Sequence, residues 1–439
     1  MKQSRWIVLI IVATAMMMGY FVNDLMSPLE TLLEAPRSEG GLEWTSSDYG
    51  FFSGAGSFIN VFLLMLFFSG IILDKMGVRF TGTLACSLMV AGVLIKLYGM
   101  TTDFGEAQLS LFSFQLPKSV AVMSLGFAIF GVGYEMCGIS VSKAMVRWFT
   151  GHELALAMGL QLAMARLGTA AALSISAPIA QRYTLSTPLL VGFSFLIIGL
   201  LAYLVFCVMD RKMEVQGTVS TTYNSNEEFR WSDIGGILSN PGFWLITLFV
   251  VLFYSAVSPF LKFATRLLIV KYSVDPDVAG FITSLAPFGT MLLTPLFGSF
   301  YDRRGHGVTL VIIGTVMLAL VHFGFSLPLH SSSLAIALML VLAIGYSLAP
   351  AALWPCIPKI IPLKCLGTAY SLIFFIQNFG RAIIPMLVGT ANERDPSYTS
   401  GMLIFAFTAT AATGVAIALL IADRHKHYGL QLPNIKKTV

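Results

Sequence analysis

Two oppositely charged side chains stand inside stretches of the sequence that are otherwise apolar. Glu135 precedes Thr150 by fifteen residues, and Arg166 follows Thr150 by sixteen. If the two stretches are antiparallel helices joined at Thr150, both charges lie at one depth, roughly 23 Å from the turn at 1.5 Å per residue. A carboxylate and a guanidinium at one depth can pair with each other, or they can bind the two ends of a zwitterion.

The cost of these two charges favours a functional role. An ionised group at the centre of a membrane-spanning helix costs at least about 2.5–3.5 kcal/mol and is a functional candidate by default. The structural alternative is a permanent salt bridge between Glu135 and Arg166 that only locks their two helices together. We favour a substrate site.

Other polar residues in apolar stretches are weaker candidates for the same site. Asp24 could hold an ammonium group, or it could cap a helix kink near Pro28. Lys262 and Arg266 are four residues apart and share a helix face, where they could attract a carboxylate or extend to the surface. Lys96 is expected to extend to the membrane surface in the same way.

Amides and aromatic rings complete the predicted site. Gln377 and Asn378 precede Arg381, and their amides both donate and accept hydrogen bonds, which suits a peptide bond. Tyr254, Phe260 and Trp354 are expected to pack or to wall a pocket for apolar side chains. The predicted substrate-binding residues are therefore Glu135, Arg166, Asp24, Tyr254, Lys262, Trp354, Gln377, Asn378 and Arg381.

The composition requires a membrane to surround these residues. Hydrophobic residues make up 56% of the chain and charged residues 11%, against roughly 25% charged in soluble domains. A bilayer is crossed by about 20 apolar residues. Twelve segments qualify: Trp6 to Leu33, Ser47 to Leu73, Phe80 to Gly99, Ser119 to Phe149, Leu154 to Gln181, Thr187 to Met209, Phe243 to Val270, Val278 to Tyr301, Val308 to Leu327, Ser333 to Ile361, Leu366 to Thr390 and Thr399 to Ala422.

One long polar stretch divides these segments into two sets of six. Residues 210–240 are rich in Ser, Thr, Asn and charge, and they read as a linker with a short surface helix near Ser232 to Leu238. The predicted fold is an all-α membrane protein of twelve transmembrane helices in two pseudo-symmetric halves. Residues 1–209 form the first half, 210–240 a cytoplasmic linker, and 241–439 the second half with a short cytoplasmic tail.

The distribution of basic residues predicts the orientation. With both termini cytoplasmic, 16 of the 27 Lys and Arg residues fall inside and 5 outside, as the positive-inside rule requires. The chain contains no Asn-x-(Ser/Thr) sequon, and its tails carry no acidic dileucine signal. These two absences favour a bacterial inner membrane over a lysosome.

A short signature occurs twice, at corresponding places in the two halves. Residues Gly70 to Gly77 read GIILDKMG, and residues Gly298 to Gly305 read GSFYDRRG. The repeated loop, the twelve segments and the central linker resemble the major facilitator superfamily over the whole chain. Val78, where the first copy usually has a base, is a departure from that pattern.

The signature loops are predicted to act as a conformational gate. An acid in such a loop can cap a helix N-terminus and pair with a base across the seam between the halves. The predicted gate residues are Asp74, Arg79, Asp302 and Arg303.

Longer strings resemble one branch of the superfamily, the animal lysosomal dipeptide uniporters. RWFTGHEL at Arg147 to Leu154 and GLQLAMARLG at Gly159 to Gly168 look like the region of their helices 4 and 5. ALWP ending at Pro355, LGTAY from Leu366 and IQN ending at Asn378 look like their helices 10 and 11. The resemblance implies that Glu135 and Arg166 occupy positions where that branch carries a substrate-site Glu and Arg.

Several functions are excluded or made unlikely by what the sequence lacks. There is no phosphate-binding Gly-x-x-x-x-Gly-Lys-(Ser/Thr) loop, no metal-ligand spacing and no nucleophile signature. We therefore expect no enzyme activity, no cofactor, no metal and no nucleic-acid partner, and a monomer in the lipid bilayer.

The sequence thus predicts a facilitative or secondary active transporter that moves small peptides, dipeptides first, by alternating access. One alternative is an organic-anion carrier of the oxalate–formate type, with Arg166 and Arg381 as a two-cation clamp, or another small-metabolite carrier. The other is a non-transporting membrane sensor or scaffold. Uniport and proton coupling are both left open.

Overall fold

The computed structural model describes residues 2–105, 107–111, 114–149, 154–215, 231–361 and 366–433. Within these ranges, eleven helices are long and apolar enough to cross a membrane. They are α1 (Lys2–Asp24), α5 (Met65–Thr101), α6 (Lys118–Phe149), α7 (Leu154–Arg182), α8 (Thr187–Val215), α10 (Pro241–Val270), α11 (Pro276–Arg304), α12 (Gly307–Ser326), α13 (Ser332–Leu353), α15 (Leu366–Arg394) and α16 (Thr399–Lys426).

Short elements connect the long helices. They are η1 (Ser27–Leu29), α2 (Glu30–Glu34), η2 (Arg37–Glu39), α3 (Ser46–Ala55), α4 (Phe58–Phe62), α9 (Trp231–Leu238), η4 (Trp354–Cys356), α14 (Ile357–Ile360) and the strands β1 (Gln108–Leu111) and β2 (Phe114–Pro117). The two strands pair antiparallel, with Gln108 opposite Pro117.

The predicted second span, Ser47 to Leu73, is present as a broken helix. Helix α3 begins with a capping box between Thr45 and Asp48 and ends at Ala55, α4 follows, and Leu64 is left-handed with φ 53° before α5 begins. The break lies where α6 comes close, because the Asn60 side-chain amide donates to the Gly131 carbonyl at 3.2 Å. The apolar pattern located this span, but it could not show the interruption.

The glycines that end the two signatures share one backbone conformation. Gly77 has a φ of 77° and Gly305 a φ of 76°. A side chain is strained in this left-handed region, whereas glycine adopts it without cost. The bend at Gly77 lies inside α5, so α5 contains both the end of the predicted second span and the whole third one.

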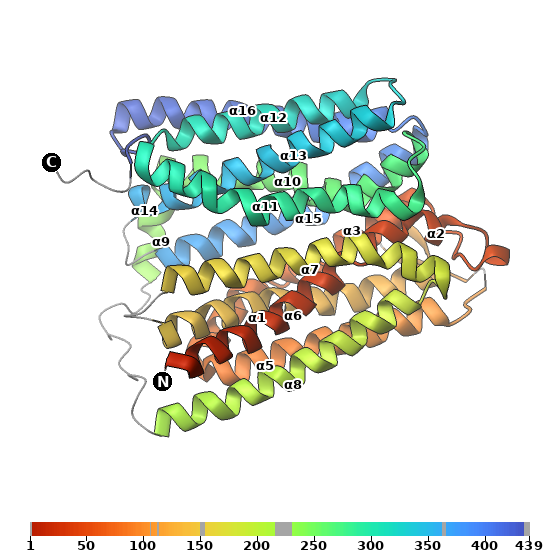
Figure 1. Cartoon of the computed structure of the whole chain (residues 1–439), viewed down its shortest axis with the longest axis horizontal. Helices are drawn as coiled ribbons and strands as arrows, with labels where there is room; N and C mark the ends of the chain where they lie inside the picture. The colour runs from red at the N-terminus through yellow and green to blue at the C-terminus, as the bar shows by residue number, and fades with distance from the viewer. Residues whose placement is uncertain are drawn as a thin grey trace.

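Two ends of the molecule are named by what lies there (Figure 1). Both chain ends and α9 lie at one end, here called the terminal end, and α2 and η2 lie at the other, here called the loop end. Helices α1 to α8 and helices α10 to α16 form two groups side by side in the picture. The described helices agree with an all-α major facilitator architecture.

The two groups meet most closely towards the loop end. Helix α3 packs on α15, where a Cβ added to Gly50 would come within 3.0 Å of the Gly389 Cα. The Ser47 and Thr390 hydroxyls lie 3.3 Å apart across the same seam. Glycine at this seam lets the two backbones approach closely.

The linker prediction meets the structure at its edges. Helix α8 continues past Met209 to Val215 and buries Asp210, and α9 (Trp231–Leu238) lies where a short helix was predicted. The rest of the predicted linker, residues 216–230, lies outside the described residues. The division into domains stays a prediction.

Candidate functional site

A polar pocket lies between the two groups of helices. It holds about 920 Å³ of space, part of it open to solvent, which is within the usual range for small-molecule sites. Its lining comes from α1, α3, α6, α7, α10, α13 and α15, so both groups of helices contribute side chains. Five charged or amide residues predicted from the sequence line it: Asp24, Arg166, Lys262, Gln377 and Arg381.

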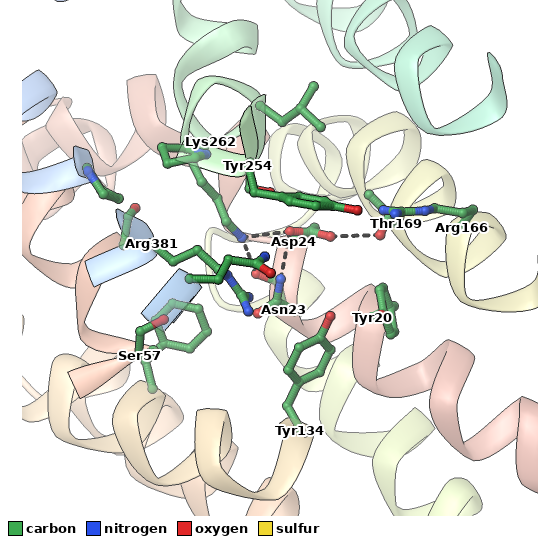
Figure 2. A pocket seen from close by; sticks show the side chains of 18 of the residues that line it. Tyr20, Asn23, Asp24, Ser57, Tyr134, Arg166, Thr169, Tyr254, Lys262 and Arg381 are labelled. Carbon is green, nitrogen blue, oxygen red and sulfur yellow. Dashed lines mark hydrogen bonds and ion pairs between the residues drawn. The ribbon is translucent and has the colours of Figure 1, made fainter. Parts of the chain in front are cut away.

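Asp24 lies at the centre of this pocket (Figure 2). It is the last residue of α1, and its Oδ1 is 2.7 Å from the Lys262 Nζ of α10. Thr169 donates to the other carboxylate oxygen at 2.8 Å, and the Asn23 amide donates to Oδ1 at 2.9 Å. Lys262 also donates to the Asn23 carbonyl at 2.5 Å. Both predicted roles of Lys262, attraction of a free carboxylate and extension to the surface, give way here to an ion pair between the two groups of helices.

Glu135 pairs with Arg381 rather than with Arg166. The Arg381 Nη1 lies 2.6 Å from the Glu135 Oε1, and this pair joins α6 to α15. Equal depth on neighbouring helices was the basis for expecting Glu135 and Arg166 to meet. Depth does not fix the rotation of a helix about its axis, and Glu135 faces the other group of helices.

Arg166 therefore has no acid partner among the described residues. Its guanidinium lies 5.3 Å from the centre of the Tyr346 ring, and Tyr20, Tyr134 and Tyr254 line the same pocket. Tyrosine faces attract a cation and tyrosine hydroxyls can hydrogen-bond to it, but they do not neutralise its charge. Figure 2 shows Arg166 and Asp24 on opposite sides of the Thr169 hydroxyl.

The predicted amide and aromatic residues divide between the pocket and its surroundings. Tyr254 lines the pocket, and its hydroxyl accepts a hydrogen bond from the Trp354 indole at 3.2 Å, so Trp354 supports it from behind. Gln377 lines the pocket, whereas Asn378 is buried beside it and donates to the Phe374 carbonyl. Phe260 packs among His322, Phe325 and Phe405 in the second group of helices, away from the pocket.

Lys96 does not extend to the membrane surface, and that prediction was wrong. Its side chain is 0% exposed, and its Nζ lies 4.7 Å from the centre of the Phe127 ring. Phe52 and Phe130 complete an aromatic cage around it. Helix α5 turns this face inward against α6, where Gly92 and Gly126 allow close contact.

Of the predicted gate residues, Arg79 makes ion pairs that stay within one group of helices. Its guanidinium lies 2.6 Å from Glu214 and 3.6 Å from the fully buried Asp210, both in α8. Arg303 is exposed, Asp302 is partly exposed, and nothing can be said of the Asp74 side chain, which lies outside the described side chains. The Arg79 pairs do not cross the seam between the two groups.

A second charged cluster lies towards the loop end and was missed at the sequence level. The Arg266 guanidinium lies 2.5 Å from the Glu34 carboxylate and 3.8 Å from that of Glu30, so α10 is joined to α2. The signal was available, because Glu30 and Glu34 are four residues apart in an apolar stretch after Pro28. Tyr20, Tyr134 and Tyr346 were missed as well, and Tyr134 stands directly beside Glu135.

A family model matches this chain from residue 9 to residue 385, and its description is Major Facilitator Superfamily. The chain belongs to the Major Facilitator Superfamily. As a member, it is a multi-pass membrane transporter of small molecules and not an enzyme.

Curated relatives and solved structures agree with this assignment. The lysosomal dipeptide transporter MFSD1 of Bos taurus is 27% identical over 84% of this chain and 76% of its own length, and the Danio rerio protein of the same name is 27% identical over 84% and 78%. A POT family transporter in complex with a thioalcohol-conjugated peptide has a TM-score of 0.69 at 14% identity, over 96% of both chains. The nucleoside transporter NupG has a TM-score of 0.66 at 14% identity, over 95% of this chain and 98% of its own. The likeness to these superfamily structures shows the fold alone.

Proposed function

We propose that this transporter moves dipeptides through the central pocket by alternating access. The observation that carries the proposal is the free charge of Arg166 beside an Asp24 carboxylate whose partners are replaceable side chains. A dipeptide has a carboxylate for the first and an ammonium for the second. The curated MFSD1 relatives, which are dipeptide transporters, support the same substrate class.

Each end of a dipeptide finds a matching group. The planar guanidinium of Arg166 can donate two parallel hydrogen bonds to the carboxylate. The ammonium can replace the Lys262 ammonium at Asp24, because both offer the same charge and donors. The Gln377 amide, which also faces the pocket, can serve the peptide bond between them.

The same contacts link binding to movement. Lys262 and Arg381 belong to the second group of helices, and their acid partners Asp24 and Glu135 belong to the first. A ligand ammonium that takes Asp24 from Lys262 removes one bond between the two groups. A ligand changes a conformational equilibrium only through such a difference in contacts between states.

An organic-anion carrier is the second candidate, because of the charge balance of the pocket. Arg381 is balanced by Glu135 and Lys262 by Asp24, which leaves Arg166 as a net charge of one. A monocarboxylate would neutralise that charge by itself. The presence of Asp24 at the centre of the pocket favours the zwitterion. The bacterial inner membrane, the cytoplasmic termini and the choice between uniport and proton coupling remain proposals at this level.

A thermal-shift screen of the purified protein tests the substrate class. Unmodified dipeptides should raise the melting temperature, and the same dipeptides acetylated at the amine or amidated at the carboxylate should not. Free amino acids and single carboxylates serve as controls for partial ligands. Stabilisation by oxalate or formate, with none by any dipeptide, would overturn the proposal in favour of the anion carrier.

A further inference from the structure

The charged cluster near the loop end carries more negative than positive charge. One guanidinium, that of Arg266, serves both Glu30 and Glu34. The Glu30 side chain is 0% exposed and that of Glu34 is 18% exposed. Glu393 stands at the exposed rim of the same region and adds a further acid. We call Glu30, Glu34 and Arg266 the loop-end gate, because they join α10 of one group of helices to η1 and α2 of the other.

Each of the two acids leaves one oxygen without a partner. Glu30 Oε1 accepts a hydrogen bond from the Ser46 hydroxyl at 3.4 Å, but its Oε2 is buried with no partner. Glu34 Oε2 binds Arg266, and its Oε1 is buried with no partner. An unpaired carboxylate oxygen in a low dielectric is costly, and two close carboxylates strongly disfavour both being ionised.

A small cavity beside the gate supplies an independent observation. It is lined by Glu34, Arg266, Asn392, Glu393 and Tyr398, among others. The Asn392 side chain is 3% exposed, and neither its carbonyl nor its amide group has a partner. The Tyr398 hydroxyl is also buried without a partner. Unsatisfied polar atoms around a polar cavity are the usual surroundings of bound water or a small ion.

No other charged group near the pair restores the balance. Helix α10 offers Lys262, which is bound to Asp24, and α3 offers Asp48, which is bound to Thr45. Tyr49 of α3 faces Glu30, and its hydroxyl donates to the Lys262 carbonyl. Helix α7, which also packs on η1, has no charged side chain between Arg166 and Arg182.

We infer that the Glu30–Glu34 pair binds one proton while the loop-end gate is closed and releases it to water when the gate opens. The proton passes from a hydronium ion in the cavity to a carboxylate oxygen, which leaves one neutral acid, one carboxylate and one guanidinium. The cluster is then balanced, and the neutral acid can donate to a buried oxygen. When the gate opens, water solvates both acids and the proton leaves. This inference concerns the gate alone and does not depend on which substrate the pocket takes.

The sign of the effect follows from linkage. The closed state holds a proton that the open state does not hold near neutral pH, so acid favours the closed gate. One coupled proton changes the ratio of closed to open molecules by at most about tenfold per pH unit. Substitution of one acid by glutamine leaves one carboxylate for one guanidinium, so the gate should close without a proton.

Distance measurements between spin labels across the loop end test this. Cysteines at Ser38 and Arg394, which are exposed on opposite groups of helices, carry the labels in a chain whose five native cysteines are replaced. In lipid nanodiscs, the closed fraction of the otherwise unchanged chain should rise as pH falls from about 8 to about 5, a range above the ordinary carboxylate values of about 4. Glu30→Gln and Glu34→Gln should be closed throughout, while the rim control Glu393→Gln should follow the unchanged chain.

Further arms separate the remaining possibilities. If the glutamine variants do not fold, Glu34→Asp keeps the charge and should move the midpoint of the pH response. An infrared band of a protonated carboxyl should grow with the closed fraction. The inference is overturned by a gate that ignores pH, by a pH response that persists in both glutamine variants, or by an unmoved midpoint in Glu34→Asp. A closed fraction that depends on sodium at fixed pH would assign the site to a metal cation instead.

Discussion

The central pocket and the loop-end gate contain similar residues in opposite proportions. The pocket brings Arg166, Lys262 and Arg381 together with Asp24 and Glu135, which leaves one positive charge over. The gate brings Glu30 and Glu34 to Arg266 alone, which leaves one negative charge over. The difference teaches that each region lacks a partner of a particular sign, an anionic group in the pocket and a cation in the gate.

The direction of the ion pairs shows a second difference along the molecule. The pairs of Lys262, Arg266 and Arg381 all join one group of helices to the other. At the terminal end, the pairs that Arg79 and Arg147 make with α8 stay within the first group. The described ion pairs therefore hold the two groups together from the pocket to the loop end, which is the arrangement of a transporter closed on that side.

Removal of Arg166 should have the largest effect of any single change. Arg166→Ala removes the charge that the substrate carboxylate meets, and loss of one partner of a buried charged hydrogen bond costs about 2–5 kcal/mol, or a loss of affinity of at least about 30-fold. Uptake of radiolabelled dipeptide into proteoliposomes measures it. Arg166→Lys should recover only part of the uptake, because a point charge replaces a two-pronged donor. Arg182→Ala, at the exposed end of the same helix, should transport normally.

The Glu135–Arg381 pair should matter next, and chiefly for stability. Glu135→Gln or Arg381→Met leaves one buried charge without its partner, which costs up to about 3–5 kcal/mol. The double substitution should recover most of that loss, since a neutral pair is often as stable as a buried ion pair. Thermal unfolding of the two single variants and the double variant checks this. Additive losses in the double variant would show that the two residues do not act as a pair.

Arg266→Gln should weaken the gate by less, because part of its role passes to water. The gate then contains two acids and no cation, so the labelled loop end should shift towards open at about pH 8 and should close less on acidification. The same spin-label distances measure it, with dipeptide affinity as the control that should change little. A gate that stays closed in this variant would remove Arg266 from its role.

The smallest effect is expected at Asp395, between α15 and α16. Its carboxylate accepts from the Ser397 hydroxyl and from the Ser400 amide and hydroxyl, and these hydrogen bonds hold the pKa of Asp395 well below its ordinary range. Its contribution to stability is therefore complete above the ordinary value of about 3.9 and is lost only as pH falls through the lower folded value. Asp395→Ala should cost about 0.5–2 kcal/mol at neutral pH, as loss of a helix cap does. The pH response of the gate should be unchanged, and a changed response would show that Asp395 belongs to the gate.

Sequence and structure agree on what depends on chain composition, and they differ on what depends on helix rotation. Apolar length located the spans, and the doubled signature indicated the superfamily that the family model confirms. Depth placed Arg166 and Asp24 at the pocket, but it could not show that Glu135 would turn to Arg381 or that Lys96 would turn inward to Phe127. The inter-group pairs of Arg266 were missed because they join residues more than 200 positions apart, which no local pattern relates.

The central claim is that Arg166 receives the carboxylate of a dipeptide. Calorimetric titration of one dipeptide and its C-terminal amide, each into the unchanged protein and into Arg166→Ala, isolates that contact as a double-mutant cycle does. In the unchanged protein and in Arg182→Ala, we predict that the amide binds at least about 30-fold more weakly than the acid. In Arg166→Ala, acid and amide should bind with equal, low affinity. An amide penalty of the same size with and without Arg166 would contradict the account.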